Sequence, residues 1–234
     1  VFCSWAAEEY GLVGSVEWGE QFTKQLHSRA IAYLNVDMAL EGNYTLRTKS
    51  APLLYDIIYQ ATKMIPNPDK AEVEAGHLSV YDTWVARKPD PENPDMPLMQ
   101  FIGSGSDYKV LQHNIGIPSL DVRYTHDEET LGEPLYHTLY ETFALVDELY
   151  DQGFLFHTAV TQLWGQLAVA LADAKILPLS LGAYSQFIAD AQVDLNNTFG
   201  EMIEAKNLSL VHFISAGHKF SASVTEFEAA LESL

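Results

Sequence analysis

Two adjacent glutamates, an aspartate and a histidine stand at positions where their side chains could do hydrolytic chemistry. Glu8 and Glu9 follow an apolar, β-favouring run over residues 1–6. Asp37 comes near the end of a second apolar run, and His137 stands at the start of an expected helix. Because open α/β sheets gather their ligands at the carboxyl ends of strands, we expect these side chains to meet at one edge of a sheet. Glu, Asp and His are the ligands of hydrolytic zinc sites, and a further carboxylate can act as general base.

Each of these residues also has a plainer explanation when it is taken alone. Adjacent acids such as Glu8 and Glu9 often form a solvated helix entrance. An aspartate at a strand end, as at Asp37, often caps a turn or a helix. A histidine at a helix start, as at His137, often makes a structural hydrogen bond. The residues one by one leave both explanations open, and only their occurrence in four suitable places favours a metal site.

Strand and helix patterns alternate over the first part of the chain. Apolar runs predict strands over residues 1–6, 30–38, 43–48 and 116–125, and residues 98–112 predict a strand end, a Gly-Ser-Gly turn and a helix. Helical spacing is found over residues 16–28, with Ser15 as N-cap, and over residues 51–65 and 137–150. Residues 66–77 and 87–97 predict a long, proline-rich surface loop. We therefore expect an α/β fold with a mostly parallel, mixed sheet flanked by helices.

From about residue 153 the chain shows only helical patterns. One apolar stripe begins at Val160 and ends at Leu171, a second runs from Tyr184 to Phe199, and residues 226–234 continue the pattern. We expect residues 1–165 to belong to the sheet domain and residues 166–234 to form a helical segment packed beside it.

The composition excludes several classes of protein. A chain of 234 residues that is 47% hydrophobic can hold one large globular domain or one and a half. Its 32 acidic and 13 basic residues give a net charge of −19, which argues against nucleic-acid binding. The single Cys3 excludes an internal disulfide, and no apolar run reaches the roughly 18 residues that span a bilayer. These 234 residues contain no signal-peptide pattern, which carries little weight in a sequence that does not begin with methionine, and the glycosylation sequons at Asn43, Asn196 and Asn207 slightly favour an extracellular location.

Four sequence blocks resemble, in the same order, blocks of the glutamate carboxypeptidase II family. They are SWAAEEYGLVGSVEW, AYLNVDMALEGNYTLR, GSGSDY and PLYHTLYET, and they cover residues 1 to about 150. The family contains di-zinc peptidases related in fold to the transferrin receptor. The segments HLSVYDTW, GSGSDY and ILPLSLGAYSQFI are most similar to the N-acetylated alpha-linked acidic dipeptidase-like branch. The resemblance implies a zinc exopeptidase fold, short peptide substrates and a homodimer formed through the helical segment.

The resemblance also implies a role for each matching position in the metal centre. Glu8 would be the general base and proton shuttle. Glu9 and His137 would bind one of two zinc ions, and Asp37 would bind the other. Tyr136 would stabilise the oxyanion of the tetrahedral intermediate.

Further positions match the family's substrate cleft and a structural calcium site. Gly105 and Ser106 would line the cleft, where close backbone approach favours glycine. Glu17 and Glu20 would bind a calcium ion, and their i, i+3 spacing does place both on one helix face. A solvated helix face is the plainer explanation for the second pair.

One departure from the family concerns substrate preference. Members that cleave acidic peptides carry a patch of arginines, of which Arg123 is present here, while its partner position holds Asp121. A carboxylate there should repel an acidic side chain and could attract a free α-ammonium group. We therefore expect a broader, aminopeptidase-like preference, unless Asp121 pairs with a base of the protein itself.

A second departure concerns completeness. The family's metal centre needs an upstream His-x-Asp, whose aspartate bridges the two zinc ions, and no residue precedes Val1 to supply it. We expect this chain to be a fragment that binds zinc poorly and is inactive by itself, whereas its parent is a peptidase. The resemblance further implies that the parent is a type II membrane protein. Its anchor would lie outside this chain, and this region would lie at the extracellular face of the plasma membrane.

Two other functions are weighed against the peptidase. The first is a non-catalytic, transferrin receptor-like module for dimerisation and protein binding, and the second is a metal-free α/β binding module. A receptor has no need of the base and the zinc ligands, so the presence of Glu8, Glu9, Asp37 and His137 favours the enzyme.

Overall fold

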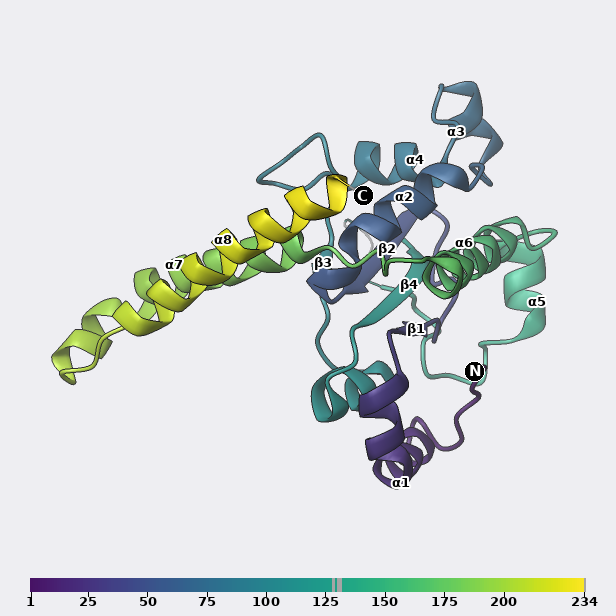
Figure 1. Ribbon diagram of the computed structural model, residues 1–234. Coiled ribbons are helices and arrows are strands. Elements are labelled where there is room, and N and C mark those ends of the chain that lie inside the picture. Colours follow the sequence, from purple (N-terminus) through teal and green to yellow (C-terminus); the bar gives the residue numbers. More distant parts are fainter. Residues whose placement is uncertain (128, 130–131, 234) are drawn as a thin grey trace. The chain divides into compact units, whose positions relative to one another are not determined.

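The computed structural model describes every residue except 128, 130, 131 and 234, and the chain divides into two compact units (Figure 1). The first unit is Val1–Pro178 and the second is Leu179–Leu234. In the first unit the helices are α1 (Val13–Arg29), η1 (Pro52–Leu54), α2 (Tyr55–Met64), α3 (Lys70–Glu74), α4 (Val80–Arg87), η2 (Val110–Ile115), α5 (Phe143–Leu145), η3 (Val146–Tyr150) and α6 (Leu155–Asp173). The second unit consists of α7 (Leu181–Ala205) and α8 (Val211–Glu232).

The first unit is built on a mixed sheet with the strand order β1-β4-β2-β3. The strands are β1 (Tyr33–Asn35), β2 (Thr45–Ser50), β3 (Gln100–Phe101) and β4 (Ser119–Thr125). The pairs β1–β4 and β2–β3 are parallel, and β2–β4 is antiparallel. The predicted mixed α/β architecture is therefore confirmed.

Alternation along β2 and β4 gives the sheet one apolar and one charged face. Leu120 and Val122 of β4 are fully buried, whereas Arg47 and Arg123 stand opposite each other on the other face. Helices α4 and α6 pack on the sheet, and α2 packs against both of these helices (Figure 1). A T-shaped contact between Tyr124 and Phe156, with ring centroids 4.9 Å apart, joins β4 to α6.

Helix α6 carries the apolar stripe that the sequence predicts, and it belongs to the first unit. Val160, Leu163 and Leu167 are almost completely buried. The indole Nε1 of Trp164 donates a hydrogen bond of 3.0 Å to the carbonyl oxygen of Leu34 in β1. The stripe and the indole together fix α6 on the sheet. The domain division expected at residue 165 stays a prediction.

Helix α1 packs against η2 and forms a smaller apolar cluster. Val110, Leu111 and Ile115 of η2 are buried there, and Val16 and Trp18 of α1 pack on them. A side chain in place of Gly19 would meet Val110 at 2.8 Å, so glycine lets the two segments approach closely.

The predicted strand over residues 1–6 is wrong. These residues pair with no strand that the structure describes, and Val1, Phe2 and Cys3 are exposed. The segment is held by Trp5, whose indole donates to the hydroxyl of Tyr33 (2.9 Å) and packs against Trp18. Apolar, β-favouring residues make a strand only where a neighbouring strand can satisfy the backbone groups.

Three further expectations differ from the structure. Ser15 lies inside α1, which begins two residues earlier, and its hydroxyl bonds to the carboxylate of Asp107 instead of capping the helix. The proline-rich excursion holds the short helix α3, and α4 follows it with a capping box formed by Ser79 and Asp82. The helix expected over residues 137–150 begins only at Phe143, since turns occupy the residues before it.

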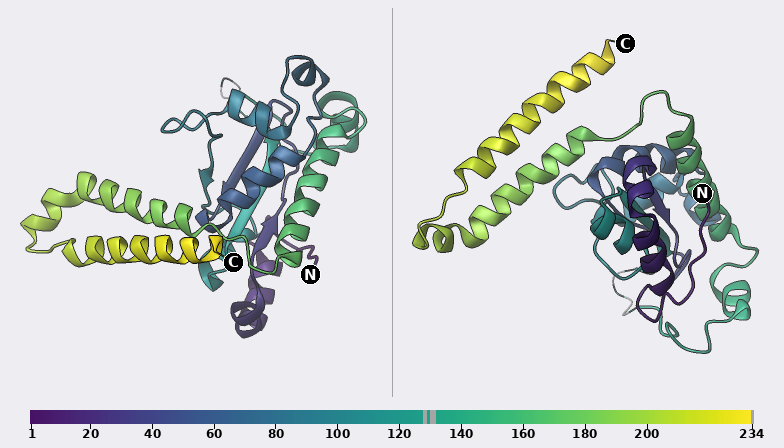
Figure 2. Two further views of the ribbon diagram at one scale, coloured as in Figure 1. Left: turned by 45° about the horizontal axis from the view of Figure 1, so that its top comes forward. Right: turned by 60° about the horizontal axis from the view of Figure 1, so that its bottom comes forward.

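The second unit is a helical hairpin, in which α7 and α8 run antiparallel (Figure 2). The amide of Gln192 donates a hydrogen bond of 2.7 Å to the carbonyl oxygen of Phe213. The ring of Tyr184 meets that of Phe220 in a T-shaped contact. A side chain at Gly217 would meet the Gln192 amide at 2.4 Å, so glycine allows this crossing.

In the described part of the chain, no helix taken singly has the length and apolar character of a membrane span. The segments Phe143–Tyr150 and Leu155–Asp173 together have the length and apolar composition of a membrane span, but the chain bends by 104° between them.

We predict that Leu167→Ala lowers the free energy of unfolding by about 2–5 kcal/mol, because it leaves a cavity between α6 and the sheet. The matched control is Val169→Ala on the same helix, where the side chain is exposed and the expected change is within about 0.5 kcal/mol. Urea unfolding followed by circular dichroism measures both. Equal effects of the two substitutions would show that α6 is not packed as described.

Candidate functional site

The segment that carries Glu8 and Glu9 is folded into a tight turn just before α1. The amides of Gly11 and Leu12 both donate to the carbonyl oxygen of Glu8, at 3.0 and 2.8 Å. Gly11 has a φ of +107°, a conformation that L side chains rarely adopt. A side chain at Gly14 would meet the carbonyl oxygen of Ala6 at 2.6 Å. The two glycines therefore let the turn present the glutamates without help from a strand.

His137 and Glu9, which are 128 positions apart in the sequence, are in direct contact. The Nε2 atom of His137 lies 2.9 Å from Oε1 of Glu9, and both side chains are about half exposed. The His137 ring stacks on the ring of Tyr136, with centroids 3.8 Å apart, and its backbone amide donates to Glu141. The structure thus brings together two of the predicted zinc ligands and the predicted oxyanion-binding tyrosine.

The electrostatic environment of Glu8 includes three other carboxylates. Burial raises the pKa of Glu8, and the negative charges of Asp37, Glu9 and Asp107 raise it further. Asp37 is exposed two residues beyond β1, and it is near enough for its charge to act on Glu8. A carboxylate whose pKa is raised accepts a proton more readily, which suits a general base.

The donor atoms present suit zinc only in part. Glu9 and His137 offer one carboxylate oxygen and one imidazole nitrogen, as zinc requires. In the described part of the chain, however, no three His, Cys, Asp or Glu side chains lie close enough together to hold one ion. Within the described residues the site therefore consists of a pair of ligands and a neighbouring carboxylate, and not of a closed metal site.

The predicted substrate residue Arg123 is held in a network of ion pairs on the charged face of the sheet. Its Nη1 atom lies 3.1 Å from Glu41 and its Nη2 atom 3.1 Å from Asp121. Glu41 also pairs with Arg47 at 2.9 Å and accepts a hydrogen bond of 2.7 Å from Thr125. Burial alone would raise the pKa of Glu41, but the Thr125 hydrogen bond and the two arginines outweigh it and lower that pKa.

Asp121 is buried, and both of its oxygens accept hydrogen bonds. Oδ2 takes the Arg123 guanidinium, and Oδ1 accepts a hydrogen bond of 2.8 Å from the Asn35 amide. Of the two alternatives that the sequence leaves open for Asp121, pairing with a base of the protein is the one that the structure shows. Its charge is compensated internally and not left free for a substrate ammonium group.

Gly105 and Ser106 form the turn that the sequence predicts. Gly105 has a φ of +114°, and Ser106 is buried with its hydroxyl accepting a hydrogen bond of 3.0 Å from Asn35. The sequence reasoning missed Asn35 and Asp107, which hold this turn in place. The signal for Asn35 is a polar residue inside an otherwise apolar run.

The remaining predicted residues lie on the surface. Glu17 and Glu20 are both exposed on α1, as a shared cation or a solvated face would equally require. The three predicted glycosylation sites Asn43, Asn196 and Asn207 are exposed as well. Calcium binding and glycosylation stay predictions.

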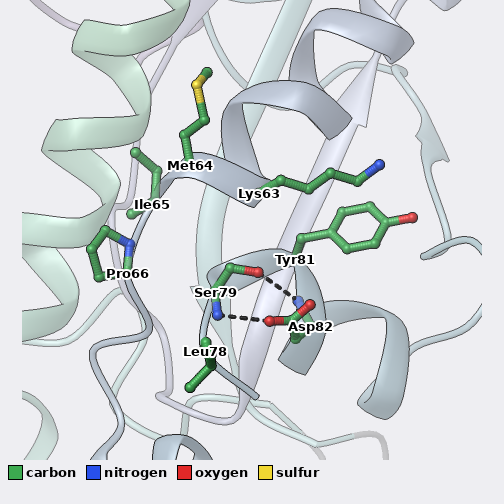
Figure 3. A pocket seen from close by; sticks show the side chains of 8 residues that line it. All are labelled: Lys63, Met64, Ile65, Pro66, Leu78, Ser79, Tyr81 and Asp82. Atoms are coloured by element: carbon green, nitrogen blue, oxygen red, sulfur yellow. Dashed lines mark hydrogen bonds between the residues drawn. The ribbon is translucent and has the colours of Figure 1, made fainter. Parts of the chain in front are cut away.

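A hollow outside this site lies between the end of α2 and the start of α4 (Figure 3). It has a volume of about 460 Å³. The ammonium group of Lys63 lies 4.5 Å from the centroid of the Tyr81 ring at its edge. Its lining residues are Lys63, Met64, Ile65, Pro66, Leu78, Ser79, Tyr81 and Asp82, and none of them is a predicted site residue.

A mixed α/β unit in which carboxylates and an imidazole meet beside a candidate general base has the groups that a hydrolase needs. Residues 1–152 match the family model of Peptidase family M28. The chain belongs to this family.

Named relatives agree with the family. The chain is 36% identical over 228 residues to Aminopeptidase NAALADL1 of Rattus norvegicus, covering 95% of this chain and 30% of the relative. It is 36% identical over 181 residues to a glutamate carboxypeptidase 2 homolog of Caenorhabditis elegans, covering 77% and 23%. It is 32% identical over 209 residues to the Probable glutamate carboxypeptidase LAMP1 of Arabidopsis thaliana, covering 89% and 28%. The resemblance seen in the sequence is confirmed, and the chain spans less than a third of the length of these relatives.

We predict that Glu41→Gln lowers the free energy of unfolding at pH 7 by about 1.5–3 kcal/mol, because Arg47 and Arg123 would then face each other without a shared carboxylate. Because the pKa of Glu41 is lowered on folding, its contribution is complete above its ordinary value of 4.5 and is lost as the pH falls through the lower folded pKa. The difference between wild type and variant should therefore shrink below pH 4.5.

The control for this prediction is Glu92→Gln, because Glu92 is an exposed loop residue. Urea unfolding at a series of pH values measures both variants. A Glu41→Gln effect that is the same at every pH would contradict the charge pairing.

Proposed function

We propose that this chain is part of a zinc-dependent exopeptidase that hydrolyses peptide bonds at one end of short peptides. The contact between His137 and Glu9, beside Glu8, is the observation that carries the proposal. It places an imidazole and two carboxylates together in a chain that belongs to a peptidase family.

Each group has a definite task in such a reaction. Glu9 and His137 would hold one zinc ion and Asp37 would hold the other, and zinc supplies Lewis acidity toward water and the peptide carbonyl when it is bound. Glu8, with its raised pKa, takes the proton of the attacking water and passes it to the leaving amine. The ring of Tyr136 stacks on that of His137, and its hydroxyl stabilises the developing oxyanion.

We propose further that the polypeptide of residues 1–234 binds zinc weakly and is inactive by itself. Two donors and a neighbouring carboxylate support this, since half-filled metal sites lose affinity and geometry together. The complete centre would need at least one more ligand from elsewhere in the natural protein.

The substrate preference rests on the names of the relatives, which include an aminopeptidase and glutamate carboxypeptidases. We propose cleavage of single residues from peptide ends without strict preference for acidic side chains. Arg123 supports this, because its guanidinium group is already bound to Glu41 and Asp121.

We also propose that the parent protein is a glycosylated type II membrane protein. The exposure of Asn43, Asn196 and Asn207 is compatible with glycosylation at the extracellular face of the plasma membrane. A calcium ion bound by Glu17 and Glu20 would be structural.

The proposed homodimer would form through the helical hairpin. Exposed apolar side chains on it, including Phe199 and Met202, are of the kind that an interface buries.

We predict that Glu8→Gln in the natural protein that carries this chain lowers kcat by about 10²–10⁴-fold while zinc content is kept, because only the proton acceptor is lost. His137→Ala should lower zinc content as well as activity, because it removes a ligand. Peptide hydrolysis assays and metal analysis measure the two effects. An active Glu8→Gln protein would refute the proposed mechanism, and strong peptidase activity of residues 1–234 alone would refute the proposed incompleteness.

We predict that the pair Phe199→Glu and Met202→Glu converts the natural protein from dimer to monomer in analytical ultracentrifugation, because charges would then lie in the apolar interface. The control is Asn197→Glu, a charge added at an exposed polar position of the same helix. Dimerisation of the double variant at wild-type strength would exclude this face.

A further inference from the structure

A buried amide joins three segments of the first unit that carry candidate site residues. The Nδ2 atom of Asn35, at the end of β1, donates to the hydroxyl of Ser106 at 3.0 Å and to the carboxylate of Asp121 at 2.8 Å. Asn35 is 5% exposed, Ser106 1% and Asp121 2%. The two bonds therefore fix β1, the Gly-Ser turn and β4 relative to one another, away from competing water.

A second buried hydrogen bond continues this connection to α1. Asp107, the residue after Ser106, accepts a hydrogen bond from the hydroxyl of Ser15. Ser15 is completely buried near the start of α1, and Leu12, whose carbonyl oxygen it also contacts, belongs to the turn that presents Glu8. The Glu8 segment, which pairs with no described strand, is thereby tied to the same network.

The chemistry of the amide explains why asparagine suits this position. An amide nitrogen has two hydrogens, and both are used here on acceptors that are themselves buried. An aspartate would place a second negative charge against Asp121, and an apolar side chain would leave two buried acceptors without their donor. No other common side chain of this size supplies two donors without a charge.

Asn35 and its partner Asp121 each lie two residues from a candidate site residue. Asp37 is two residues further along, and Arg123 is two residues beyond Asp121 on the same face of β4. Asn35 is hydrogen-bonded directly to Ser106 and Asp121, and its own side chain is buried. Its effect on catalysis is therefore indirect and passes through the residues to which it is bonded.

We propose that Asn35 is a positioning residue, which through Ser106 and Asp121 sets the placement of Asp37 and the Gly105–Ser106 turn relative to the Glu8 segment. This inference rests on the proposed peptidase function. Loss of the amide should therefore weaken metal binding and slow turnover without abolishing the fold.

The test compares Asn35→Asp with wild type in the natural protein that carries this chain. Zinc affinity, measured by competition with a chromophoric chelator, should fall by about 10–100-fold, as it does when residues that orient metal ligands are lost. In the zinc-saturated protein kcat should fall by at least about ten-fold while KM changes by less than about two-fold, because reacting groups are misplaced. The double variant Asn35→Asp with Asp121→Asn exchanges amide and carboxylate, and it should recover part of both losses because the pair can hydrogen-bond again.

The control for general destabilisation is Leu167→Ala, a core variant at a residue that is not a candidate site residue. Measured at a temperature where it is as fully folded as Asn35→Asp, it should keep wild-type zinc affinity and kcat. Wild-type zinc affinity and kcat in Asn35→Asp, or equal losses in Leu167→Ala, would overturn the inference. If Asn35→Asp behaves like wild type while Glu8→Gln is inactive, the positioning role of Asn35 is wrong and the proposed peptidase function stands. An active Glu8→Gln protein would instead refute the proposed function itself.

Discussion

The buried charges on strand β4 impose the constraint on which the first unit depends. Asp121 and Arg123 point to the face opposite the apolar side chains of β4, where neither can be left unpaired without a large cost. Glu41 and Asn35 satisfy them from outside β4. Because Asn35 ends β1 and Glu41 lies between β1 and β2, this pairing joins β4 to the neighbouring strand and to the segment that follows it.

The same constraint explains how a site can form on segments that lack regular structure. Glu8 and Glu9 stand on a turn, and His137 stands on another, with a φ of +60°. Such segments depend on hydrogen bonds and tight glycine turns for their placement, since no ladder of backbone bonds supports them. Only a few side-chain interactions connect the Glu8 segment to the rest of the unit, and the site is more sensitive to their loss than a site built on strands would be.

The effect of Asp121 on substrate preference depends on the groups that surround it in the fold. A carboxylate in place of an arginine reverses the charge of a side chain, but the charge that a ligand meets depends on what the side chain already binds. With Arg123 bound to Asp121 and Glu41, and Arg47 bound to Glu41, two carboxylates and two guanidinium groups form a closed group. This surface is consistent with a peptidase that lacks a strict preference for acidic side chains, and it gives no separate attraction for an ammonium group.

The sequence by itself determined the mixed α/β class, the strands near β1, β2 and β4, the apolar stripe of α6 and the family, because periodicity and sequence blocks are local properties. Only the tertiary structure decided that residues 1–6 are not a strand, that Asp121 is paired and that Asn35 joins three segments. Whether a backbone finds a partner strand, or a carboxylate a donor, depends on residues that are distant in the chain. The 2.9 Å contact of His137 with Glu9 is of the same kind: the residue types suggested it, and the fold made it.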